Sequence, residues 1–363
     1  MEIVKLFSMM VKHNASDLHV KVGQPPVFRV SGQLSRMQNV SSLEPDQTQQ
    51  LLEPLLSEDQ LATLRSRGNV DFAWYQEDVG RFRCNIFLQR GYLSAAIRKV
   101  NLEIPSYEQL GLPADIAKVA EYEAGLVLIG GVTGSGKSTT LASILSDINN
   151  KRRCHILTIE DPIEYLFHDN LAIINQREIG IDVMDFKDAL RAAVRQDPDV
   201  MLVGEMRDAE TFETALTAAE TGHLVFGTVH SSGAAQTIGR ILDLFPEEKH
   251  EQIRTGLGFN LRAVLNQKLL RAKDKAVGRV PAVETMFNTP IVRKLILEGE
   301  DNRLHDAIKA DTDNGCRSFN QVLAILVKQG KITQDVALKA APNAEELRMA
   351  MSGIVISDAG GIV

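Results

Sequence analysis

The stretch "GLVLIGGVTGSGKSTTLASILSDINN" (125–150) places an apolar run, a glycine-rich turn and a helical pattern one after another. Its centre, "GVTGSGKST" (131–139), satisfies the pattern G-x-x-x-x-G-K-[ST]. Glycines let the backbone curl so that several N–H groups point inward at phosphate oxygens, and the start of the following helix adds partial positive charge. Because the pattern stands between a predicted strand and a predicted helix, it predicts a nucleotide-binding loop.

The side chains of this loop have separate expected tasks. Lys137 is expected to reach the β- and γ-phosphates, and the Ser138 hydroxyl is expected to ligate Mg²⁺. The residues expected to bind the nucleotide are Gly131, Thr133, Gly134, Ser135, Gly136, Lys137, Ser138 and Thr139.

Apolar runs and helical patterns alternate on the carboxyl side of the loop. The runs "HILTIED" (155–161), "DVMLVGE" (199–205) and "HLVFGTVH" (223–230) read as strands, with helical stretches such as "FKDALRAAVRQ" between them. This alternation predicts an α/β fold with a mostly parallel sheet covered on both faces. From about residue 234 onward the chain reads as helical, including "EQIRTGLGFNLRAVLNQKLL" (251–270).

The first part of the chain has a different rhythm. Ile3, Leu6, Phe7 and Met10 recur at helical spacing, and strand-like runs follow between Gly, Pro and Asp turns. In "RFRCNI" (81–86) the side chains alternate between two faces, so an antiparallel sheet with one covered face is expected. We therefore expect a small α+β domain over 1–100, a linker over 101–112 and a nucleotide-binding domain over 113–363.

Composition limits the possible functions. Of the 363 residues, 44% are hydrophobic and 24% are charged, which is typical of a globular protein. The formal net charge of −7 does not favour nucleic acid as a partner. No run approaches the ~18 apolar residues of a membrane span. Cys84, Cys154 and Cys316 are far apart and form no CxxC pair, which argues against a disulfide framework and a thiolate zinc site.

Acidic residues follow two of the predicted strands. Glu205 ends one apolar run, and Glu160, Asp161 and Glu164 follow another. In open α/β sheets ligands bind outside the carboxyl ends of the parallel strands, so these acids are expected beside the phosphate loop. Hydrolysis of a nucleotide needs a magnesium ligand and a group that orients or deprotonates water, and these acids are the candidates.

Taken together, several motifs resemble the PilT-like motor ATPases of type IV pili, within the secretion ATPase superfamily. The motifs are "GVTGSGKSTT" (131–140), "TIEDPIEY" (158–165), "NQREIG" (175–180), "ALRAAVRQDPDVMLVGEMRDAET" (189–211) and "ALTAAETGHLVFGTVHSS" (215–232), with "ASDLHVKVGQPPVFRVSGQL" (15–34) in the first domain. The resemblance implies a PAS-like first domain and a RecA-like P-loop second domain with C-terminal helices. It also implies ATP and Mg²⁺ as ligands and ATP hydrolysis as the activity.

The resemblance also assigns roles to residues. Lys137 and Ser138 fall in Walker A, Glu164 in the acidic "Asp box" and Glu205 in Walker B. Glu164 and Glu205 are both candidates for positioning the attacking water; we favour Glu164 as the base and Glu205 as the magnesium ligand. The arginines expected to act across a subunit boundary are Arg81, Arg83, Arg195 and Arg207.

The "His box" of the family contains His223 and His230. An odd number of residues separates the two histidines, so in a regular strand their side chains face opposite ways. At about 3.3 Å per residue the separation spans roughly 23 Å. They are therefore not expected to share a metal ion within one chain. We expect His230, at the carboxyl end of its strand, to lie near the γ-phosphate and to report ATP against ADP. His223 is expected to be a structural or subunit-contact residue.

As to cellular role, the resemblance implies a cytoplasmic homohexamer at the inner face of the cell membrane that drives pilus retraction and twitching motility. Its implied partners are an inner-membrane platform protein of the pilus and a second motor ATPase, with no nucleic acid. Retraction motors carry the helix A-I-R-N-L-I-R-E, and "IVRKLILE" (291–298) matches it at Arg293, Leu295, Ile296 and Glu298. An accessory motor like PilU, or a nucleotide-binding assembly module with little hydrolysis, is the alternative.

Overall fold

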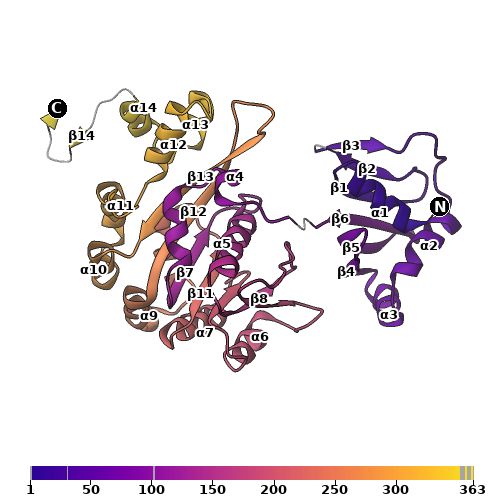
Figure 1. Ribbon diagram of the computed structural model, residues 1–363, viewed down its shortest axis with the longest axis horizontal. Coiled ribbons are helices and arrows are strands. Elements are labelled where there is room, and N and C mark those ends of the chain that lie inside the picture. The colour runs from indigo at the N-terminus through magenta and orange to yellow at the C-terminus, as the bar shows by residue number, and fades with distance from the viewer. Residues whose placement is uncertain (1, 31, 101–102, 352–355, 358–360, 363) are drawn as a thin grey trace. The chain divides into compact units, whose positions relative to one another are not determined.

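The computed structural model describes residues 2–30, 32–100, 103–351, 356–357 and 361–362. The chain folds into two compact units (Figure 1). The first unit contains Met1–Glu103 with Glu164–Leu166, and the second contains Ile104–Ile163 with Phe167–Val363. Of the expected linker, residues 101–102 lie outside the described residues, and the short helix α4 (Tyr107–Leu110) belongs to the second unit.

The first unit is built on a six-stranded sheet in the order β3-β2-β1-β6-β5-β4, in which each pair of neighbours is antiparallel. Three helices and a single 3₁₀ turn (Glu53–Leu55) accompany the sheet among the described residues. In chain order the elements are α1 (Ile3–Lys12), β1 (Ala15–Val20), β2 (Val27–Val30), β3 (Gln33–Arg36), α2 (Pro45–Leu52), α3 (Glu58–Arg67), β4 (Asn69–Gln76), β5 (Gly80–Gln89) and β6 (Tyr92–Lys99).

One face of this sheet is covered, as the sequence predicted. Helix α1 buries Ile3, Leu6, Phe7 and Met10, the four residues at helical spacing. On β5, Phe82, Cys84 and Ile86 are buried while Arg83 between them is exposed. The Phe7 and Phe82 rings stack with centroids 4.4 Å apart, which joins the helix to the sheet in one apolar core. The expectation of a small antiparallel α+β domain is confirmed.

The second unit is built on a seven-stranded sheet in the order β13-β12-β7-β11-β10-β8-β9. Its strands are β7 (Gly125–Gly130), β8 (His155–Glu160), β9 (Ile173–Glu178), β10 (Val200–Val203), β11 (Leu224–Val229), β12 (Leu261–Arg271) and β13 (Arg279–Phe287). The pairs are parallel except β12 with β13, which is antiparallel. The residues of β7, β10 and β11 are buried throughout, as expected for parallel strands covered on both faces, and the predicted α/β fold is confirmed.

Helices connect and cover these strands (Figure 1). Helix α7 packs against β7 and β11, α5 against β7, and α8 against β12 and β13. The helices around the sheet are α5 (Lys137–Lys151), α6 (Phe186–Ala193), α7 (Ala209–Glu220), α8 (Ala234–Leu242) and α9 (Glu247–Asn260), with 3₁₀ turns at Ala114–Ala120 and Asp301–Arg303.

The C-terminal helices lie beside the β12–β13 hairpin, where α12 contacts β13 (Figure 1). They are α10 (Pro290–Glu298), α11 (Leu304–Ala310), α12 (Phe319–Lys328), α13 (Gln334–Ala340) and α14 (Ala344–Met351), followed by a two-stranded pair of β14 (Ile356–Ser357) with β15 (Gly361–Ile362). In the described part of the chain no helix has both the length and the apolar character that a membrane crossing requires.

The expectation of continuous helix from residue 234 was wrong in one region. Helix α9 ends at Asn260, and the next residues form β12, which pairs with β7 from Leu126 to Gly130. Residues 261–265 are apolar apart from Arg262, and periodicity cannot assign so short a stretch to a strand or to a buried helix. The sheet decides the assignment, because β12 satisfies its backbone groups between β7 and β13. The edge strand β9 was not predicted either.

Candidate nucleotide-binding site

Four neighbouring strands of the second unit end at one edge of the sheet. They are β7, β11, β10 and β8, which are parallel to one another. The glycine-rich loop follows β7, His230 follows β11, Glu205 lies just beyond β10, and Asp161 follows β8. Topology therefore gathers residues from four separate sequence segments at the carboxyl edge, where α/β sheets bind ligands.

The loop between β7 and α5 requires glycine at three positions. Gly131, Gly134 and Gly136 have φ angles of 144°, 77° and 91°, which side chains with a Cβ rarely adopt. A Cβ on Gly131 would also lie 2.5 Å from the carbonyl oxygen of Gln267, whereas the space around Gly134 is open. The backbone thus curls tightly on its inner side and leaves room for a ligand at Gly134.

Lys137 lies over this loop at the first position of α5. Its Nζ donates hydrogen bonds to the carbonyl oxygens of Gly131 at 2.8 Å and Val132 at 3.2 Å. The ammonium group is therefore held at the mouth of the loop, and Ser138 and Thr139 follow it on the partly buried first turn of the helix.

Two adjacent polar residues of β12 form hydrogen bonds to the segments of the site, and sequence reasoning missed both. Gln267 bonds to the loop and to α5, and Asn266 donates from Nδ2 to the Ser231 hydroxyl at 2.6 Å, just after His230. Both side chains are buried. The sequence does contain a signal for them, since they form a polar pair within a mostly apolar stretch. The interpretation of 251–270 as a helix gave this pair no role.

Glu205 forms a small charged cluster with two neighbours. Its Oε1 lies 2.5 Å from Arg207 Nε and 2.7 Å from His230 Nε2, and its side chain is 20% exposed against 75% for Arg207 and 48% for His230. Burial by itself raises the pKa of Glu205, but the contacts and charges of Arg207 and then His230 outweigh it, so its pKa lies below the usual value. Glu205 is thus held ionised at the edge of the sheet.

The acids after β8 are placed differently from one another. Glu160 accepts hydrogen bonds from the Thr158 hydroxyl at 2.7 Å and from Gln176 Nε2 at 3.2 Å, so it is tied into the sheet beside β9. Asp161 and Glu164 are exposed. Glu164 makes no hydrogen bond or ion pair within the described parts of the chain, and it is grouped with the first compact unit, so its place at this edge stays a prediction.

Of the four candidate arginines, Arg207 belongs to this cluster. Arg195 is exposed just after α6, and Arg81 and Arg83 lie on β5 of the first unit. Arg207 forms an ion pair with Glu205 of its own chain, so it has a partner without a neighbouring subunit.

The two histidines lie at opposite ends of β11, as their spacing predicted. His223 Nδ1 is 2.9 Å from the Ala218 carbonyl oxygen, so its ring closes the carboxyl end of α7, which is a structural role. His230 instead contacts Glu205. Among the residues that the structure describes, no group of three or more His, Cys, Asp or Glu side chains is arranged to hold a metal ion.

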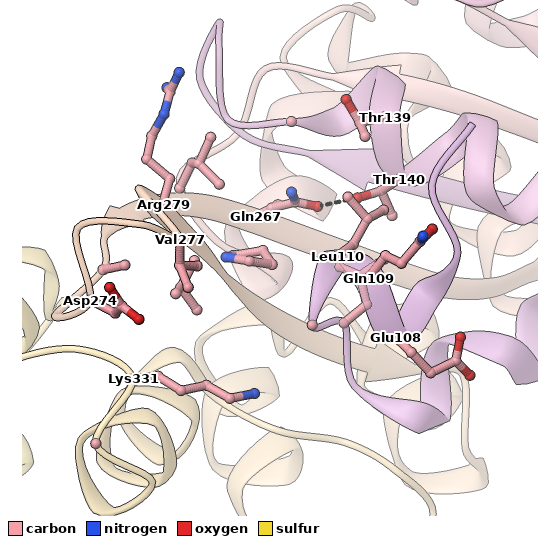
Figure 2. Close-up of a pocket in the computed structure, with 18 residues that line it drawn as sticks. Glu108, Gln109, Leu110, Thr139, Thr140, Gln267, Asp274, Val277, Arg279 and Lys331 are labelled. Atoms are coloured by element: carbon pink, nitrogen blue, oxygen red, sulfur yellow. Dashed lines mark hydrogen bonds between the residues drawn. The ribbon is translucent and has the colours of Figure 1, made fainter. Parts of the chain in front are cut away.

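A cavity of about 530 Å³ opens beside the first turn of α5 (Figure 2). Thr139 and Thr140 line it from α5, Leu110 from α4, and Val277 and Arg279 from the β12–β13 hairpin. Its volume lies within the range of roughly 300–1,000 Å³ that is common for small-molecule sites. The cavity therefore adjoins the glycine-rich loop, whose Gly136 is one of its lining residues.

Comparison with known proteins identifies the family. The family described as "Type II/IV secretion system protein" matches residues 2–325. This chain belongs to that family. It is 41% identical to the type IV pilus retractation ATPase PilT of Pseudomonas aeruginosa, over 94% of this chain and 98% of that protein, and 38% identical to the type IV pilus ATPase PilU of the same organism, over 96% and 91%.

A solved member of the family has the same fold. The crystal structure of the pilus retraction motor PilT with bound ADP superposes with a TM-score of 0.91 at 44% identity, over 96% of this chain and 99% of that one. The resemblance to PilT-like ATPases is therefore confirmed, and so is the match to both PilT and PilU.

The cluster around Glu205 predicts a pH-dependent contribution to stability. A depressed carboxyl pKa stabilises the fold above the unfolded-state pKa of about 4.3 and loses this contribution as the pH falls through the folded-state pKa. Arg207→Ala should raise the pKa of Glu205. The difference in urea midpoint between wild type and Arg207→Ala should therefore be largest above about pH 5 and shrink toward pH 3.

Arg195→Ala is the matched control, because Arg195 is exposed and its side chain makes no ion pair in the described residues. Its urea midpoint should follow the wild-type pH profile. An Arg207→Ala profile parallel to wild type from pH 3 to pH 7 would show that the ion pair does not govern the ionisation of Glu205.

Proposed function

We propose that this chain is an ATP-hydrolysing motor that drives retraction of type IV pili. The observation that carries the proposal is the placement of the glycine-rich loop, Glu205 and His230 on three neighbouring strand ends of one sheet. The relatives named as pilus retraction and twitching motility proteins support it, since each covers most of this chain. In this proposal ATP is the substrate.

The phosphates of ATP would lie on the loop of residues 131–139. Backbone N–H groups of the curled loop and the start of α5 would hold the anionic oxygens, and Lys137 would exchange its two carbonyl contacts for the β- and γ-phosphates. Thr139 leads from the loop into the neighbouring cavity, which would receive the nucleoside. The same residues thus bind substrate and orient its terminal phosphate.

The donor set at this edge fits a hard divalent cation. Ser138 offers a hydroxyl and Glu205 an ionised carboxylate, and oxygen ligands of this kind are those that Mg²⁺ prefers. Bound there together with the nucleotide, Mg²⁺ would neutralise phosphate charge. Glu205 would then leave its contacts with Arg207 and His230, so both side chains would become available to the substrate.

Glu164 is the proposed base. Its exposed carboxylate, without a partner in the described residues, would orient the attacking water and accept its proton. His230, released from Glu205, would contact the γ-phosphate and so distinguish ATP from ADP. In a homohexamer, Arg81, Arg83 and Arg195 would be supplied by a neighbouring subunit and would stabilise the charge that develops on the phosphate.

The motor is proposed to work in the cytoplasm at the inner face of the cell membrane. Its partners there would be the inner-membrane platform protein of the pilus and a second motor ATPase, and nucleic acid would not be one of them. An accessory motor is the alternative that the 38% identity to PilU over 96% of this chain keeps open. A nucleotide-binding assembly module would instead show little turnover.

Replacing Lys137 with alanine should abolish turnover. The substitution removes the cation expected on the β- and γ-phosphates, so steady-state phosphate release should fall by at least about 100-fold, which corresponds to roughly 2.7 kcal/mol. Lys151→Ala, at the other end of α5 and paired with Asp147, is the control and should keep wild-type turnover. Equal turnover in wild type and Lys137→Ala would refute the assignment of the site.

The roles of the two carboxylates can be separated by their dependence on magnesium. Glu205→Gln should raise the Mg²⁺ concentration needed for half-maximal ATP hydrolysis, because it removes an anionic ligand. Glu164→Gln should lower kcat by about 100-fold or more with that concentration unchanged, because it removes the base. The reverse pattern would exchange the two assignments.

Deletion of the gene tests the direction of the motor. Cells without the protein should carry excess surface pili and lose twitching motility, because extension continues without retraction. The wild-type gene should restore motility, and the Lys137→Ala gene should not. Cells without surface pili would instead assign the motor to extension.

A further inference from the structure

Gln267 connects two parts of the phosphate site from a third element. It lies on β12 and is 3% exposed. Its Nε2 donates a hydrogen bond to the Ser135 carbonyl oxygen in the loop at 2.8 Å, and its Oε1 accepts one from the Thr140 hydroxyl on α5 at 2.8 Å. Figure 2 shows the bond to Thr140. One carboxamide thus fixes the loop and the following helix to the same strand.

The loop glycines lie directly against this residue. A Cβ on Gly136 would be 2.8 Å from Gln267 Nε2, and a Cβ on Gly131 would be 2.5 Å from the Gln267 carbonyl oxygen. The outer turn of the loop at Gly134 has no such neighbour. Gln267 therefore supports the inner side of the loop and leaves its outer side open for phosphate.

We propose that Gln267 is a positioning residue for nucleotide binding. It does not contact the phosphates; it holds the Ser135 carbonyl away from them and fixes the distance between the loop and the first turn of α5. This keeps the loop N–H groups, Ser138 and Thr139 in the geometry that phosphate requires. The inference rests on the nucleotide-binding part of the proposed function and is independent of pilus retraction.

The chemistry of the contact requires a carboxamide. Ser135 presents an acceptor and Thr140 a hydroxyl donor, and a glutamine side chain has one donor and one acceptor group to match them. An ionised glutamate would accept from Thr140 but donate nothing to Ser135, and leucine would do neither. Either change leaves a buried polar group without its partner, so the loop must shift to recover a hydrogen bond.

The experiment compares Gln267→Leu, Gln267→Glu and Thr140→Val in the full chain, with Thr285→Val as the matched control. Thr285 is also buried in the β12–β13 hairpin, and its hydroxyl donates to the Gly315 carbonyl oxygen at 2.6 Å, not to the loop or α5. Each variant is measured for its Kd for a fluorescent ADP analogue, its KM and kcat for ATP, and its thermal midpoint.

Gln267→Leu should raise the Kd for the ADP analogue and the KM for ATP by about tenfold, equivalent to roughly 1.4 kcal/mol, with a smaller effect on kcat. Gln267→Glu should raise both at least as much, because a carboxylate then faces the Ser135 carbonyl. Thr140→Val should have a smaller effect in the same direction, and adding it to Gln267→Leu should change the Kd no further. Thr285→Val should lower the thermal midpoint but keep the Kd within about twofold.

A Gln267→Leu protein that is less stable but binds the analogue with wild-type Kd would overturn the proposal. So would a Thr285→Val protein whose Kd rises as much, since general destabilisation would then explain both. If Gln267→Leu does not fold, Gln267→Glu and Thr140→Val carry the same comparison. A wild-type protein that binds ADP without driving retraction would refute the motor function and leave the Gln267 comparison valid.

Discussion

The parallel pairing of β7 with β11 on one side and β12 on the other is the constraint on which the site depends. β7 is fully buried and its last residue, Gly130, pairs with both neighbours, so the glycine-rich loop begins at a fixed point in the sheet. His230 then follows one of these neighbours, and Gln267 belongs to the other. Without this pairing the loop would have the right sequence but no support beneath it.

At the same edge of the sheet, the carboxylate of Glu205 lies between two cationic or titratable side chains. Glu205 is only partly exposed, and Arg207 and His230 compensate the cost of its burial by keeping the carboxylate paired. The contacts join the end of β10 to the end of β11. The cluster thus couples the proposed magnesium ligand to the proposed nucleotide sensor through direct contacts.

The β12–β13 hairpin is also connected to the C-terminal helices. On β13, Glu284 is 4% exposed and accepts hydrogen bonds from the backbone N–H groups of Ala234, at the start of α8, and Phe319, at the start of α12. Burial raises the pKa of Glu284, which these two donors partly offset. The segment after His230 and the C-terminal helices are therefore attached to the hairpin that also supports the phosphate loop.

Features that depend on residues close together in the chain could be predicted before the fold was known. The glycine-rich loop, the buried face of α1, the alternation along β5 and the separation of His223 from His230 follow from spacings of a few residues. The strand at 261–271 and the contacts of Asn266, Gln267 and Arg207 became apparent only in the folded chain. The partners of Gln267 lie more than a hundred residues earlier in the chain, and a short apolar run fits a helix or a strand equally well until the sheet pairs with it.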